Sequence, residues 1–247
     1  MSEFVNDTVG RPGDAAAVIV VDRINSYYGD SHILFDLSMN VREREVVALL
    51  GRNGAGKSTT LKTLAGAVRP RSGRIRFAGT AIEHMPSHEI ARLGLQLVPE
   101  ERRIFRGLSV EENLELAALS APEPLPLTEI FALFPRLRER RGSYGGSLSG
   151  GEQQMLAIAR ALIRRPRLVL FDEPFEGLAA VIVQNLLEVC RTLAAQGQTI
   201  LIVEQNVRAA LSLATRTYVL NNGHVVFEGT TDQLRAARDV MNRYLGV

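Results

Sequence analysis

Short apolar and alternating runs near the start of the chain predict β-strands. These runs are rich in β-branched and large apolar side chains, and we expect strands over residues 18–24, 33–41, 46–50 and 74–77. A glycine-rich loop follows the third run, and a helical pattern then begins at Lys57 and extends to about Val68. Pro70 and Gly73 are expected to stop this helix, because neither residue supports a continuing helix.

The middle of the chain, from about residue 85 to 163, has a helical and more polar pattern. Helices are expected over residues 110–119, 127–141 and 149–164, with a proline-rich break at 121–126. Beyond it, short β-rich runs at 168–172, 199–203, 217–220 and 225–227 alternate with helical segments, and Asn222-Gly223 predicts a hairpin turn before the last run.

Strands that alternate with helices predict a parallel sheet with crossover helices, which is an α/β fold. The pattern contains no internal repeat, so we expect one domain over residues 18–247, with a helical subdomain at about 85–163. Residues 1–17 combine acidic residues with a Gly/Pro break and lack the basic start and apolar run of a signal peptide, so we interpret them as an N-terminal tail.

The loop after the third predicted strand has the spacing G-x-x-x-x-G-K-[ST] of a phosphate-binding loop. It lies between a buried strand and a helix, where backbone N–H groups and the helix dipole converge on phosphate oxygens. Lys57 then supplies a charge for the β- and γ-phosphates, and the Ser58 hydroxyl can bind Mg²⁺. The predicted nucleotide-binding residues of this loop are Gly51, Arg52, Asn53, Gly54, Ala55, Gly56, Lys57, Ser58 and Thr59.

A second part of the predicted site is the apolar run LVLF, which ends in Asp172 and Glu173. Ligands collect at the carboxyl ends of parallel strands. Asp172 is therefore predicted to bind Mg²⁺, directly or through water, and Glu173 to polarise the attacking water as a general base. Paired with the phosphate loop, this reading is preferred over a solvated acidic turn.

A third element, LSGGEQ, precedes the last helix of the polar region. Ser149 is a good N-cap, and Gly150 and Gly151 leave helix-terminal N–H groups open to an anion. This string resembles the signature motif of the ABC ATPase family. GTPases and small-molecule kinases share the phosphate loop but lack this motif, and the chain has no NKxD-like string that would read guanine.

The resemblance covers the chain from about Val18 to its C-terminus and implies a P-loop NTPase core of ABC type, with an antiparallel β subdomain and a helical insert. It implies ATP and Mg²⁺ as cofactors and a head-to-tail dimer, either of identical chains or with a paralogous ATPase. In that dimer Ser149, Gly150, Gly151 and Gln153 act on the nucleotide of the partner chain. It further implies that an aromatic residue stacks on adenine, for which Tyr28 is the best match and Tyr27 a close rival.

Two positions depart from the commonest family pattern and narrow the resemblance. Glu100 stands where a glutamine usually senses the γ-phosphate and Mg²⁺, and Gln205 stands where a switch histidine is usual. Together with the strings VPE, LSVEENL and VEQN, these positions look like the ATP-binding subunit of branched-chain amino-acid importers, or of the related urea and amide importers. A further departure is Phe175, which replaces the usual Ser or Thr in a segment that, by the resemblance, crosses the dimer interface.

Composition changes this picture little. A net charge of +2 gives no sign of a nucleic-acid partner, and the single cysteine, Cys190, excludes a disulfide framework and fits a reducing compartment. No apolar run is long enough to cross a bilayer. The resemblance therefore implies a peripheral subunit at the cytoplasmic face of the inner membrane, bound to permease subunits and served indirectly by an extracytoplasmic solute receptor. A soluble ABC ATPase, such as an iron–sulfur assembly factor, is the alternative.

Overall fold

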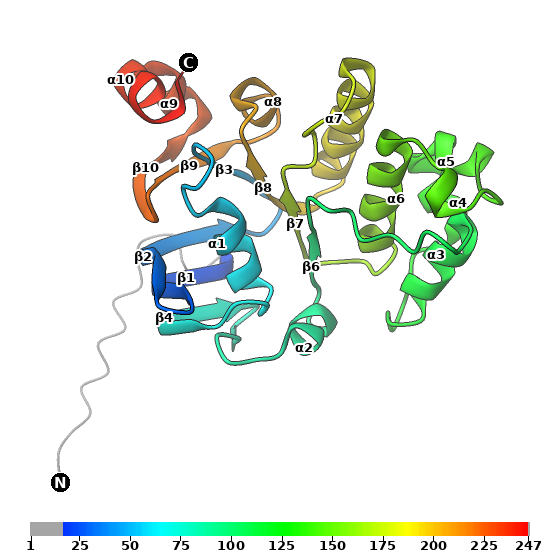
Figure 1. The fold of residues 1–247 in the computed structure, drawn as a ribbon, viewed down its shortest axis with the longest axis horizontal. Coiled ribbons are helices and arrows are strands. Elements are labelled where there is room, and N and C mark those ends of the chain that lie inside the picture. The colour runs from blue at the N-terminus through cyan, green and yellow to red at the C-terminus, as the bar shows by residue number, and fades with distance from the viewer. Residues whose placement is uncertain (1–16, 247) are drawn as a thin grey trace, which may run out of the picture.

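The computed structural model describes residues 17–246, and it contains two sheets with helices around them (Figure 1). The smaller sheet is antiparallel, with strand order β2-β1-β4-β5. Its strands are β1 (Ala17–Tyr28), β2 (Ser31–Arg42), β4 (Pro70–Phe77) and β5 (Thr80–Ala81). The predicted tail, residues 1–17, lies outside the described residues except for Ala17, which begins β1.

The larger sheet has six strands in the order β10-β9-β3-β8-β7-β6. Its strands are β3 (Val46–Leu50), β6 (Leu95–Val98), β7 (Leu168–Asp172), β8 (Thr199–Glu204), β9 (Arg216–Asn221) and β10 (His224–Thr230). All neighbours are parallel except β10, which is antiparallel to β9. Every residue of β3, β7 and β8 is buried, as expected for parallel strands covered on both faces.

Side chains that alternate along these strands enter two different cores. Val47, Leu49 and Leu170 pack with the antiparallel sheet and α1 (Lys57–Leu64). Ala48 and Phe171 pack on the opposite face, with α6 (Gly150–Leu162), α7 (Ala180–Ala195) and α8 (Val207–Leu211). The two cores on either face confirm the predicted α/β fold, and the parallel pairing of β6, β7, β8, β3 and β9 brings their carboxyl ends to one edge.

The remaining helices lie at the periphery. A group of helices on one side of the sheet comprises α3 (Val110–Ala118), α4 (Leu127–Leu133), α5 (Pro135–Glu139) and α6 (Figure 1). The others are α2 (Ser87–Arg92), α9 (Thr231–Ala236), α10 (Arg238–Val240), a 3₁₀ turn at Gly145–Ser147 and a π-helical turn at Met241–Leu245. Cys190 lies buried on α7.

Three sequence predictions of secondary structure are wrong in detail. Strand β6 lies within the range predicted to be helical, and it pairs with β7 in the main sheet because its short apolar run is buried there. The helix expected over 127–141 divides at Phe134, since Pro135 begins a new helix. Helix α1 ends at Leu64, before Gly66, and the next strand already begins at Pro70.

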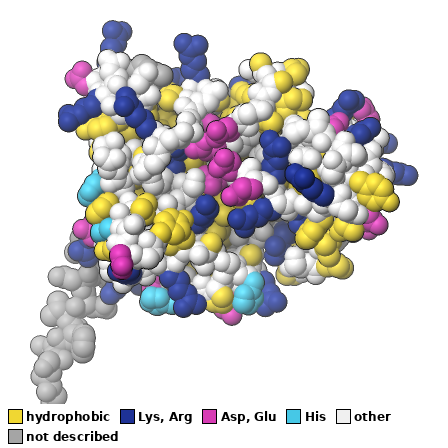
Figure 2. All heavy atoms as spheres, viewed as in Figure 1, with side chains coloured by type: hydrophobic (Ala, Val, Ile, Leu, Met, Phe, Trp, Pro, Cys, Tyr) yellow, Lys and Arg dark blue, Asp and Glu magenta, His cyan; other side chains and the backbone are white. Residues whose placement is uncertain are grey.

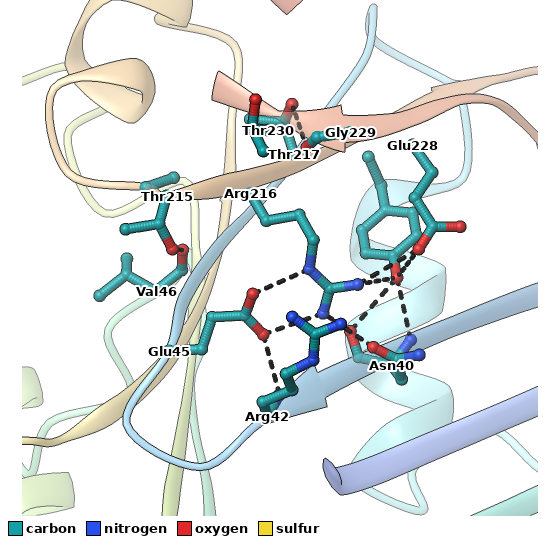
Figure 3. Close-up of polar contacts among 12 residues, drawn as sticks. Asn40, Arg42, Glu45, Val46, Thr215, Arg216, Thr217, Glu228, Gly229 and Thr230 are labelled. Atoms are coloured by element: carbon teal, nitrogen blue, oxygen red, sulfur yellow. Dashed lines mark hydrogen bonds and ion pairs between the residues drawn. The ribbon is translucent and has the colours of Figure 1, made fainter. Parts of the chain in front are cut away.

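A buried polar cluster joins the two sheets (Figure 3). The Arg216 guanidinium on β9 donates from Nε and Nη2 to the two carboxylate oxygens of Glu45, at 2.8 and 2.9 Å. It also donates to the backbone and side-chain oxygens of Asn40 on β2, both at 2.8 Å, and to the Tyr218 hydroxyl at 2.8 Å. Because Arg216 is buried, these bonds replace the water that its charge would otherwise need.

Replacing Arg216 with Met is expected to lower the free energy of unfolding by about 3–5 kcal/mol, because it leaves the Glu45 carboxylate without its cation inside the protein. Urea unfolding of the purified chain measures this loss. The matched control is Arg191→Met, which removes a surface ion pair with Glu188 and is expected to change stability by less than about 1 kcal/mol. Equal losses in the two variants would show that the cluster contributes no more than a surface pair.

The lengths and compositions of the helices bear on a membrane span, and Figure 2 shows how charges are distributed on one face. Among residues 17–246, no helix combines the length and the apolar composition needed to cross a bilayer. On the face that Figure 2 shows, acidic side chains gather near the middle with Lys and Arg beside them. This mixture agrees with the small net charge.

Candidate active site

The phosphate loop lies between the end of β3 and the start of α1. Gly54 and Gly56 have φ values of 77° and 107°, which L side chains rarely adopt, so both positions favour glycine. Gly56 caps α1 without a side-chain hydrogen bond, so the first-turn N–H groups of the helix have no side-chain acceptor at the cap. Gly223 in the β9–β10 hairpin donates its N–H to the Ala55 carbonyl at 2.8 Å and anchors the loop.

Lys57 joins the phosphate loop to the second half of the site. Its ammonium group lies 3.1 Å from Glu173 Oε1 and donates to the Arg52 carbonyl at 3.3 Å. Both members of the ion pair are buried, with 4% and 8% of the side chains exposed. The structure thus brings together two predicted residues that are far apart in the sequence.

Ser58 and Asp172 form the candidate magnesium site. The Ser58 hydroxyl donates to Asp172 Oδ1 at 2.8 Å, and burial raises the pKa of the Asp172 carboxyl while this hydrogen bond lowers it. One hydroxyl and one carboxylate beside a phosphate loop fit Mg²⁺, which takes few protein ligands and completes its shell with phosphate and water oxygens. Glu100, the third predicted magnesium ligand, lines a cavity together with Ser58, and its role as a ligand stays a prediction.

Glu173 lies just beyond β7 in a left-handed conformation, with φ at 48°. Its N–H donates to the Val203 carbonyl at 3.0 Å, and Gln205 Nε2 donates to its Oε2 at 2.7 Å. Burial alone would raise the pKa of Glu173, but hydrogen bonds from Glu176 and Gln205 and the Lys57 charge lower it overall. The carboxylate is therefore ionised at neutral pH and can accept a proton.

Lys57, Ser58 and Glu173 line one cavity of about 410 Å³, and Asp172 reaches it through its hydrogen bond with Ser58. Its walls come from β2 of the antiparallel sheet, the phosphate loop with the start of α1, and the loops that follow β6, β7 and β8. The lining residues are Ile33, Asn53, Gly54, Gly56, Lys57, Ser58, Thr59, Glu100, Glu173, Glu176 and Gln205. The structure thus gathers most of the predicted phosphate, magnesium and base residues around one space.

The signature residues lie elsewhere, at the start of α6. Ser149 caps this helix with a capping box that includes Glu152, and Gln153 donates its amide to the carbonyls of Gly145 and Leu148. A Cβ on Gly151 would lie 2.6 Å from Ile182 on α7, so the helix start packs too closely there for any larger residue. Ser149, Gly150, Gly151 and Gln153 do not line the cavity described above.

The two tyrosines proposed for adenine have different surroundings. Tyr27 stacks on His32 with ring centroids 4.0 Å apart, and the Arg71 guanidinium covers it at 4.1 Å. Tyr28 is 46% exposed. Because the Tyr27 ring already contacts His32 and Arg71, Tyr28 is the tyrosine that is open to a ligand, and its role stays a prediction.

Two acidic residues of the site were missed by sequence reasoning. Glu176 lines the cavity, and its hydrogen bond with Glu173, together with burial, raises its pKa to about 7. Glu204 ends β8 almost fully buried, and burial raises its pKa to about 7. The sequence contains a signal for Glu204, because it ends a buried, mainly apolar strand just as Asp172 does. Phe175, which directly precedes Glu176 in the sequence, is buried in the core.

Comparison with known proteins identifies the family of this chain. The profile of the ABC transporter family matches residues 34–176, more than half of the chain. The high-affinity branched-chain amino acid transport ATP-binding protein BraG of Pseudomonas aeruginosa is 44% identical over 91% of this chain and 98% of its own length. The lipopolysaccharide export system ATP-binding protein LptB of Acidithiobacillus ferridurans is 39% identical over 87% and 90%.

Solved structures agree with this match. A structure described as the ATP binding subunit of an ABC transporter is 31% identical, with a TM-score of 0.79, over 93% of this chain and 96% of its own. The family profile, the relatives and the geometry of the cavity lead to one conclusion. The chain belongs to the ABC transporter family, as an ATPase that binds ATP with Mg²⁺.

Proposed function

We propose that this chain hydrolyses ATP to drive the import of branched-chain or chemically related amino acids through a membrane permease. The observation that carries the proposal is the 44% identity to BraG, which extends over nearly the whole of both chains. Glu100 and Gln205, which mark the same branch, both line the nucleotide cavity. Lipopolysaccharide export is a second candidate, because LptB relatives match nearly as well.

Within the chain, the proposed roles follow from the contacts. Lys57 binds the β- and γ-phosphates, and Glu173 accepts a proton from the attacking water. Gln205 orients the Glu173 carboxylate through the 2.7 Å hydrogen bond. Ser58, Asp172 and Glu100 hold Mg²⁺, which supplies neutralisation of phosphate charge when it is bound. Tyr28 stacks on the adenine.

The working unit is proposed to be a head-to-tail dimer, of two copies or of this chain with a paralogous ATPase. The signature residues at the start of α6 are directed to the partner's nucleotide, because they do not line the cavity of their own chain. Dimer closure around two ATP molecules then drives the permease, to which the chain binds at the cytoplasmic face of the membrane. Phe105, 45% exposed, is a proposed apolar contact with the permease.

The test is reconstitution with the permease subunits and the solute receptor of a branched-chain amino-acid importer. In liposomes, leucine-loaded receptor is expected to raise ATP hydrolysis several-fold over empty receptor and to drive leucine uptake. A complex that carries Glu173→Gln is the control for uptake that does not depend on this ATPase. If a lipopolysaccharide permease raised the rate of ATP hydrolysis instead, lipopolysaccharide export would replace amino-acid import as the proposed function. A stable complex with soluble partners alone would refute the transporter assignment.

A further inference from the structure

Glu204 occupies a central position at the carboxyl edge of the main sheet. It is the last residue of β8, level with Leu50 of β3, while Val203 before it is level with Asp172 of β7. It therefore lies between the strand that leads into the phosphate loop and the strand that leads to Glu173. Its side chain is only 2% exposed.

The Glu204 carboxylate accepts hydrogen bonds from the backbones of two loops. Oε1 accepts the Phe175 N–H at 3.1 Å, from the loop that follows Glu173. Oε2 accepts the N–H groups of Gln205 and Asn206 at 3.1 and 3.2 Å, from the loop that follows β8. Each oxygen therefore serves a different loop, and the carboxylate joins the two.

These two loops carry the pair of side chains closest to the proposed chemistry. Glu173 lies two residues before Phe175, and Gln205 directly follows Glu204. The Gln205 amide meets the Glu173 carboxylate at 2.7 Å, a distance that depends on how the two loops are held relative to each other. No ion pair of Glu204 with a cation occurs among residues 17–246, so backbone N–H groups are its hydrogen-bond donors there.

A buried carboxylate at the end of β8 lowers the free energy of unfolding, so the stability of the sheet alone does not explain its presence. Burial disfavours the ionised form, and an apolar side chain at the end of β8 would avoid that cost. A carboxylate offers something that an apolar or amide side chain cannot, which is two acceptor oxygens facing opposite directions. The two loops use both of them.

We propose that Glu204 is a positioning residue for ATP hydrolysis, which holds the loop after Glu173 and the loop of Gln205 in register so that the Gln205 amide meets the Glu173 carboxylate. This inference rests on the proposed role of Glu173 as general base. Glu204 itself touches neither nucleotide nor water in this scheme, and it acts through the two loops.

The test is Glu204→Gln, which keeps the shape of the side chain but leaves one acceptor oxygen. The new amide NH₂ must then face the N–H donors of one loop, so that loop shifts. We expect kcat for ATP hydrolysis to fall at least about tenfold, the rate equivalent of roughly 1.4 kcal/mol. The Kd for MgATP, measured with the catalytically silent ATP analogue AMP-PNP, is expected to stay within about threefold, because the phosphate loop is untouched.

Two further variants separate positioning from general destabilisation. Ile200→Ala truncates a buried residue near the opposite end of β8. If this variant lowers the melting temperature as much as Glu204→Gln does, we still expect it to retain most of the kcat of the unmodified chain. In a Gln205→Ala background, Glu204→Gln is expected to lower kcat by a clearly smaller factor than in the unmodified chain. The reason is that the hydrogen bond from Gln205 to Glu173, which Glu204 helps to position, is already absent.

The proposal fails if Glu204→Gln leaves kcat unchanged, or if it lowers kcat and MgATP affinity together. It also fails if the double variant Glu204→Gln with Gln205→Ala loses kcat by the product of the two single-variant factors. A further contradicting result would be an Ile200→Ala variant that is as stable as Glu204→Gln and loses as much kcat. Failure of the general-base role is a separate result, since it is read from the turnover of Glu173→Gln alone.

Discussion

Glu173→Gln is expected to bind MgATP with near-normal affinity and to hydrolyse it at least about a hundredfold more slowly than the unmodified chain. The amide keeps an oxygen that can accept from Lys57, so the contact at 3.1 Å survives in a weaker form. It cannot take up a proton, whereas the native carboxylate is held ionised by Lys57 and the hydrogen bonds around it. Binding and turnover are therefore expected to separate in this variant.

Single-turnover hydrolysis of radiolabelled ATP measures the chemical step, and equilibrium binding of a fluorescent ATP analogue measures affinity. Glu188→Gln is the matched control, because it makes the same substitution at an exposed carboxylate on α7. The control is expected to hydrolyse ATP at the unmodified rate. Near-normal turnover of Glu173→Gln would refute the general-base assignment.

The parts of the site that the sequence predicts are those in which local pattern and chemistry coincide. The phosphate loop follows a buried run and opens a helix, so its position in the fold is determined by neighbours in the sequence. Asp172 ends the otherwise apolar strand β7 and Glu173 follows it, and parallel strands bring such ends to one edge. Their proximity to Lys57 and Ser58 could therefore be expected before the structure.

The parts that the sequence does not predict depend on contacts between distant segments. Strand β6 has only four residues, too few to distinguish a buried strand from a helical segment by periodicity. The role of Glu204 depends on the backbone N–H of Phe175, which lies 29 positions earlier. Backbone donors leave no trace in residue type, so a carboxylate that binds them looks like any acid at a strand end.

Lys57 pairs with Glu173 in this structure and is proposed to bind the phosphates of ATP, so its removal is expected to affect both stability and nucleotide binding. Lys57→Ala leaves the Glu173 carboxylate buried without its cation, and breaking a buried pair of this kind costs about 3–5 kcal/mol of unfolding free energy. The same change removes the charge aimed at the phosphates. A hydrogen bond to a charged group contributes about 1.5–3 kcal/mol, so MgATP affinity is expected to fall by at least about tenfold.

A double variant separates the two functions of Lys57. Adding Glu173→Gln to Lys57→Ala removes the unpaired charge, so urea unfolding is expected to show that part of the lost stability returns. Isothermal titration with MgATP is expected to show no recovery of affinity, because the phosphates still lack their cation. If the double variant regained affinity along with stability, Lys57 would act on the nucleotide only by maintaining the fold. If the single variant lost affinity without stability, the Lys57–Glu173 pair would contribute nothing to the folded state.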